Sequence, residues 1–155
     1  MTKKAIVPGR GFGNIKFGME EHEVTYLLGD PDEAEVQNYG DGDSANVLYY
    51  DEQGLSMSFD SAEDFKLVEL SFESDDYTLL DAIHVGQSKE DFLAQLEKLS
   101  MEEYAQEDLT DEGFETQEVF TFEDQNISIW LEDDAVNSIQ IGPFWVDDDT
   151  INWPE

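Results

Sequence analysis

The chain contains no cysteine, and only seven lysines and arginines stand against 39 aspartates and glutamates, a formal net charge of −32 over 155 residues. The lack of cysteine excludes disulfides and thiolate metal sites. The scarcity of basic residues argues against nucleic acid and anionic membranes as partners, because an acidic surface repels both. The same charge attracts cationic partners over long distances.

Long apolar runs are also missing. None approaches the roughly 20 residues that a transmembrane helix needs, and no apolar stretch of the kind found in signal peptides follows Lys3 and Lys4. We therefore expect a cytoplasmic protein without membrane contact. The hydrophobic content of 39% is too high for a disordered acidic tail, so the chain should fold, and its length suits one domain.

The most informative stretch covers residues 15–31, IKFGMEEHEVTYLLGDP. Val24, Leu27 and Leu28 recur at helical spacing and predict one apolar helix face. Glutamates crowd the first turn, where the helix dipole favours negative charge. Gly29 can take a positive φ after the last turn, and Pro31 cannot continue the helix. The stretch therefore predicts a short amphipathic helix after an extended segment.

A similar pattern returns in the second half of the chain. Ile83 and Gly86 stand 68 residues after Ile15 and Gly18, and the turn-like residues 51–54 are matched by 123–126. In each half, runs that alternate between apolar and polar residues follow the helix and predict about four antiparallel strands. We therefore predict an α+β fold of two tandem repeats, each a helix packed on an antiparallel sheet of about four strands. The repeats span about 12–76 and 80–145 of a single domain, 1–155, with an acidic C-terminal tail at 146–155 and a flexible lead-in at 8–13.

The opening pattern resembles a known module. The residues Ile15–Met19, Glu23, Val24, Leu27–Gly29 and Pro31 resemble the start of the SmpA/OmlA (BamE-like) module, and the tandem arrangement resembles the β-lactamase inhibitory protein fold. The resemblance implies a protein-binding scaffold. The chain departs from the module because Glu20 stands where a capping threonine or serine is common and no lipobox cysteine exists, which argues against an outer-membrane lipoprotein. Small acidic proteins of this kind also resemble the immunity proteins encoded beside bacterial toxins.

Aromatic residues offer a candidate contact surface. Tyr49 and Tyr50 are adjacent on a predicted strand, so one faces inward and the other outward. The outward tyrosine could form a contact patch with Trp130, Tyr39 and Phe144, since tyrosine and tryptophan anchor interfaces. In the alternative, which the usual burial of large aromatic residues favours, Trp130, Trp145 and Phe144 pack in the core at the junction of the repeats.

Acidic residues in predicted loops complete the candidate site. The predicted partner-binding residues are Asp41, Asp43, Tyr49, Asp51, Glu52, Glu123, Asp124 and Trp130. Asp41-Gly42-Asp43 lacks the glycine and glutamate that a calcium loop places further on, so we predict no metal site. His22 and His84 occupy different points of the predicted repeats, and neither has a nucleophile or an acidic partner at a telling spacing. We therefore predict no catalytic residue, no cofactor and no enzymatic activity.

Charge and composition together favour a binding protein. We predict a non-enzymatic acidic protein with a basic protein partner, in the first place an immunity or inhibitor protein that neutralises a cognate bacterial toxin such as a basic nuclease. Complementary charge would raise the association rate by about 10–10³-fold. Two alternatives remain: a halophilic-type acidic protein of unrelated function, and a DNA mimic that binds a nucleic-acid-binding protein.

Overall fold

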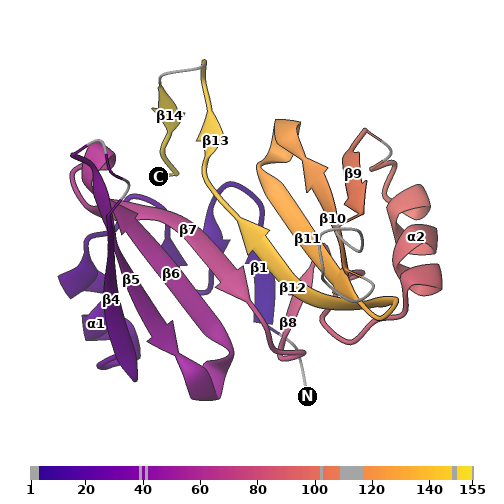
Figure 1. Ribbon diagram of the computed structural model, residues 1–155, viewed down its shortest axis with the longest axis horizontal. Coiled ribbons are helices and arrows are strands. Elements are labelled where there is room, and N and C mark those ends of the chain that lie inside the picture. Colours follow the sequence, from indigo (N-terminus) through magenta and orange to yellow (C-terminus); the bar gives the residue numbers. More distant parts are fainter. Residues whose placement is uncertain are drawn as a thin grey trace.

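The computed structural model describes residues 4–38, 40, 42–101, 103–108, 117–147 and 150–154 (Figure 1). Within these residues, two α-helices, α1 (Glu21–Leu28) and α2 (Lys89–Lys98), accompany three short 3₁₀ turns, η1 (Asp51–Gln53), η2 (Ser61–Glu63) and η4 (Glu123–Gln125). The strands of the first half are β1 (Lys4–Val7), β2 (Gly11–Phe12), β3 (Ile15–Lys16), β4 (Glu33–Asn38), β5 (Ser44–Tyr50), β6 (Leu55–Asp60), β7 (Lys66–Phe72) and β8 (Tyr77–Leu79). Those of the second half are β9 (Ala105–Asp108), β10 (Gln117–Phe122), β11 (Ile127–Glu132), β12 (Ala135–Ile141), β13 (Phe144–Trp145) and β14 (Ile151–Asn152).

One continuous antiparallel sheet of eight strands dominates the molecule, in the order β4-β5-β6-β7-β12-β11-β10-β9. The two halves of the chain meet in its middle, where Ile139 of β12 pairs with Phe72 of β7. The predicted fold class was therefore wrong. The fold is mostly β, with 50% of residues in strands and 19% helical, and it is not two helix-on-sheet repeats. The β7–β12 pairing makes one sheet where we expected two.

The N-terminal residues form a second sheet that the sequence did not predict. β1 pairs with β2 in a hairpin and runs parallel to β8, with Ile6 opposite Leu79. β2 in turn pairs with β3, which gives the order β3-β2-β1-β8. Residues 8–13, expected to be a flexible lead-in, connect and form part of this hairpin. The buried side chains of Ile6 and Phe12 explain why the segment is ordered.

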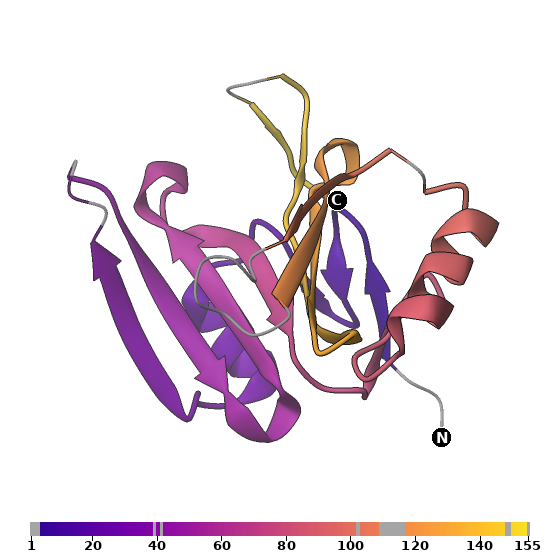
Figure 2. The ribbon, with the colours of Figure 1, turned by 45° about the vertical axis from the view of Figure 1, so that its right-hand side comes forward.

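The core lies between the large sheet and the elements on one of its faces. Figure 2 shows α1 and α2 on the same side of the large sheet, with the indigo strands of the small sheet between them. Phe12 of the small sheet packs edge-on against Phe72, with ring centroids 5.4 Å apart, and Phe92 of α2 packs against Phe120 at 5.1 Å. Val24 of α1 is fully buried in the same cluster. The helices and the small sheet thus share one core, which fixes the opposite face of the large sheet as the outer one.

Both helices begin at a capped N-terminus. Glu20 and Glu23 form a reciprocal capping box at the start of α1, and the hydroxyl of Ser88 accepts a hydrogen bond from the Asp91 backbone N–H at the start of α2. Gly29 follows α1 with a φ of 85°, the positive value expected there. The predicted end of the first helix at Gly29 is therefore confirmed.

The C-terminal residues return to the start of α1. β13 and β14 pair as a hairpin, and beyond it the ring of Trp153 lies beside Gly18 and under the Lys66 ammonium group, 5.6 Å from the ring centroid. Part of the predicted acidic tail is thereby packed onto the domain. Across the described ranges, neither helix has the length and apolar character needed to span a membrane.

Candidate functional site

A row of eight paired residues crosses the outer face of the large sheet from edge to edge. Pairing between neighbouring strands joins, in order, Glu33, Tyr49, Ser56, Ser71, Gln140, Ser128, Thr121 and Ala105. We call this set the cross-sheet row. Its members alternate along their strands with core residues such as Phe72 and Ile139, so their side chains project away from the helices. Most of the row is hydroxyl or amide, which leaves a broad hydrogen-bonding surface.

The charges in this sheet are almost all negative. Lys66, at the first position of β7, is the single basic residue in the eight strands. The carboxylates in the same strands are Glu33, Glu35, Asp60, Glu69, Glu107, Asp108, Glu118 and Glu132. A surface with this balance attracts a cationic partner and repels an anionic one.

Tyr49 is the outward tyrosine, and it lies where two hollows of the outer face meet. Its hydroxyl donates a hydrogen bond to Glu35 Oε2 at 3.2 Å, whereas the adjacent Tyr50 turns to the core side and donates to the Gly29 carbonyl at 3.0 Å. Burial raises the pKa of the Tyr49 hydroxyl, and the charge and hydrogen bond of Glu35 raise it further. Tyr49 therefore stays a neutral hydrogen-bonding group at neutral pH.

The larger hollow beside Tyr49 has a volume of about 200 Å³ and is lined by Gln37, Val47, Tyr49, Ser56, Met57, Ser58, Glu69 and Ser71. The smaller one, about 80 Å³, is lined by Tyr49, Tyr50, Asp51, Gly54, Leu55, Ser56 and Glu73. Two of the predicted site residues, Tyr49 and Asp51, therefore line the same small hollow.

Trp130 lies on the same outer face in the other half of the sheet. It pairs with Ser138 and Val119 next to the cross-sheet row, and its side chain is half-buried. Trp130 is thus at the surface of the sheet and outside the core. Phe144 is half-buried against Gly9, and Trp145 is exposed, so the alternative that placed Trp145 in the core was wrong.

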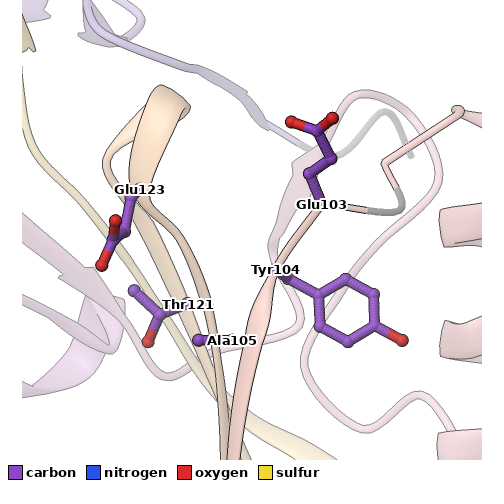
Figure 3. A pocket seen from close by; sticks show the side chains of 5 residues that line it. All are labelled: Glu103, Tyr104, Ala105, Thr121 and Glu123. Carbon is purple, nitrogen blue, oxygen red and sulfur yellow. The ribbon is translucent and has the colours of Figure 1, made fainter.

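Glu123 lines a third hollow, which lies at the β9 edge of the large sheet. Figure 3 shows its carboxylate and that of Glu103 at the rim, with Thr121 below and the ring of Tyr104 turned away toward α2. The hollow has a volume of about 400 Å³, and its described lining consists of Glu103, Tyr104, Ala105, Thr121 and Glu123. Carboxylates and a hydroxyl make it another site suited to cations.

The two predicted acidic loops do not lie together. η1 precedes β6 and η4 precedes β11, and three antiparallel pairings separate these strands in the sheet. β6 and β11 therefore run in opposite directions, so the loops project from opposite ends of the sheet (Figure 1). Asp51, Glu52 and Glu123 are all exposed at these ends. Asp43 is exposed before β5, whereas Asp41, Tyr39 and the side chain of Asp124 lie outside the described residues.

The predicted site did not include Glu69, which alternation with Leu70 places on the outer side of β7. Burial raises the pKa of its carboxyl, and the charge of nearby Asp60 raises it further. A lone glutamate on an alternating strand was the available signal, but only the pairing with β12 shows that its strand is central.

Comparison of the chain with protein-family models, curated proteins and solved structures gave no match. Within the described part of the chain, no group of three or more His, Cys, Asp and Glu side chains is placed to hold a metal ion. The geometry of the outer face is therefore the basis for a functional proposal.

Proposed function

We propose that the protein is a non-enzymatic acidic binding protein that covers a positively charged surface of a protein partner with the outer face of its large sheet. In its most specific form, the protein is an immunity or inhibitor protein that neutralises a cognate bacterial toxin in the cytoplasm. A basic nuclease has the matching charge, because its active site is built to hold phosphates.

The observation that carries the proposal is the polar cross-sheet row in a sheet with a single basic residue. Hydroxyl and amide side chains supply hydrogen bonds to a partner, and Tyr49 and Trp130 supply aromatic area on either side. The acidic loops at the two ends add long-range attraction, which raises the association rate more than the final affinity.

The proposal is tested by capture of the partner from the source cell with two matched variants. Ser128→Arg places a long cationic side chain in the cross-sheet row, and Ala94→Arg makes the same change of charge on the exposed side of α2. We expect the first variant to lose the partner and the second to retain it. Equal capture by both variants would show that the outer face is not the binding surface.

One observation favours a solvent adaptation as a second candidate function. Acidic side chains are also exposed in the first turns of both helices, outside the cross-sheet row. A halophilic-type protein would carry charge on all faces in this way, because its carboxylates serve hydration more than recognition. Capture of a nucleic-acid-binding protein would instead identify a DNA mimic.

A further inference from the structure

Glu69 differs from the exposed carboxylates of the loops because it lies on a strand in the middle of the outer face. It lies on β7, one of the two central strands of the large sheet, and pairs directly with Ser58 of β6. Its side chain is half-buried and lines the hollow of about 200 Å³ together with Ser58, Ser71 and Tyr49. The carboxylate is thus held by a rigid strand at the wall of a preformed pocket.

This carboxylate is not paired within the described structure. No side chain or backbone group of the described residues gives it a hydrogen bond or an ion pair, and the charged group acting on it is the like-charged Asp60. A partly desolvated charge without a partner is costly. Protonation relieves part of that cost, which agrees with the raised pKa of Glu69. A cation delivered into the pocket would relieve it more fully.

The size and lining of the pocket narrow the choice of cation. Sites for small molecules and cofactors usually measure about 300–1,000 Å³, so a pocket of about 200 Å³ suits a single side chain. Beside the carboxylate, the hydroxyls of Ser56, Ser58 and Ser71 and the amide oxygen of Gln37 are available acceptors. A guanidinium group, with five donors in a fixed plane, matches several acceptors better than an ammonium group.

We propose that this pocket is the anchor site for one arginine side chain of the partner, with Glu69 as its ion-pair acceptor and the surrounding serines as further hydrogen-bond acceptors. The assumption that the arginine belongs to a protein partner rests on the proposed function. The preference of the pocket for a guanidinium group is a property of this chain alone. Arginines in such pockets are frequent anchors of protein interfaces.

The pocket is tested first without any partner. The full chain is titrated with methylguanidinium chloride at constant ionic strength, and binding is followed by the amide chemical shifts of Ser58, Glu69 and Ser71. We expect saturable shifts with millimolar affinity, and a weaker response to methylammonium. Glu69→Gln should weaken binding at least about tenfold, whereas Glu97→Gln, which removes the same charge from the exposed side of α2, should leave it unchanged.

Chemical shift changes that do not saturate would contradict the proposal that the pocket binds a guanidinium group. Changes of equal size in the wild type and both variants would contradict it as well. Either result would mean that the cations associate non-specifically with an acidic surface. Ser58→Ala and Ser71→Ala provide a second test that keeps the carboxylate, and each should reduce the preference for methylguanidinium over methylammonium.

Partner binding separates this inference from the proposed function. If Glu69→Gln loses the probe and also weakens capture of the partner, the anchor is supported. If capture depends on Ser128 but is unaffected by Glu69→Gln, the anchor role fails and the proposed function stands. If capture is insensitive to Ser128→Arg, the proposed function fails whatever the probe does.

Discussion

Lys89 Nζ lies 2.8 Å from Glu118 Oε1, and this ion pair joins the first residue of α2 to the second residue of β10. The same oxygen accepts a hydrogen bond from Gln106 Nε2 at 2.7 Å. Glu118 is only 9% exposed, so the cost of burying its carboxylate is offset by these two donors. In a chain with seven basic residues, one of them stabilises a buried carboxylate within the fold.

We therefore predict an asymmetry between two variants of this pair. Lys89→Met leaves a buried carboxylate without its counter-ion and should lower the free energy of unfolding by about 1.5–3 kcal/mol. Glu118→Gln keeps an oxygen acceptor and leaves a lysine that can reach water, so the loss should be smaller. Urea denaturation of both variants checks this, and equal losses would contradict the dependence of Glu118 on Lys89.

The approach of Gly9 to Phe144 predicts a second stability difference. Gly9 has a φ of 75°, and a Cβ built there would lie 2.4 Å from Phe144 Cε2. Gly13 has a φ of 54° but nothing within 4 Å of the corresponding position. Gly13→Ala should cost only the backbone strain, about 1–2 kcal/mol, and Gly9→Ala should cost more because the ring must move. Thermal unfolding of the two variants compares them, and similar melting temperatures would show that the ring yields freely.

The environment of Glu69 predicts the sign of a pH effect on folding. Because burial, and then the charge of Asp60, raises the pKa of Glu69, the folded chain holds this proton more tightly than the unfolded chain. The stability contributed by this group is fully present below its unfolded pKa and is lost as the pH rises through its raised folded pKa. Glu69→Gln, which carries no titrating group, should therefore be more stable than the wild type at neutral pH, and the gain should shrink as the pH falls toward about 4.

The measurement is the free energy of unfolding from urea titrations of wild type and variant at several pH values across this range. Glu52→Gln is the matched control, since it removes an equal charge from an exposed position. If Glu52→Gln shows the same pH-dependent gain, the effect comes from the net charge of the molecule and not from the pocket.

The local signals in the sequence were sufficient for several single elements, but not for the strands β1 and β2 or for the assembly of the sheets. The helix at 21–28, the loops at 51–54 and 123–126 and the outward position of one tyrosine follow from spacing and alternation, which are properties of neighbouring residues. The fold class depended on pairings between distant segments, such as Ile139 with Phe72 and Ile6 with Leu79. Alternation of apolar and polar residues shows that a strand has an inner face, but it does not identify the strand that pairs with it. The pocket around Glu69 was missed for the same reason, because it is assembled from four strands.

A salt titration of folding distinguishes the two explanations of the net charge. If the carboxylates serve a cationic partner, the chain should remain folded at low ionic strength, and the rate of partner association should fall as salt screens the attraction. If they are a halophilic adaptation, the chain should unfold at low salt and refold as salt is added. Circular dichroism between about 10 mM and 1 M salt follows this, and the Debye length shortens from about 30 Å to 3 Å over that range. Unfolding at low salt would contradict the binding explanation of the charge.

The opposite placement of the two acidic loops predicts separable effects on association. Asp51→Lys with Glu52→Lys reverses the charge at one end of the sheet, and Glu123→Lys does so at the other. Exposed charges at the edge of an interface act mainly on the association rate, so each variant should slow association with the captured partner at low salt, by up to about tenfold, and change the free energy of unfolding by less than about 1 kcal/mol.

Because the loops share no contact, their effects on the logarithm of the rate should add in the combined variant. The control reverses two exposed charges on α2, Glu90→Lys with Glu97→Lys, which lie on the helix side of the sheet. A slowing by this control as large as that from the η1 loop would mean that the partner responds to the total charge of the molecule. In that case the loops would have no directing role, and the binding surface would have to be located by the substitutions in the cross-sheet row alone.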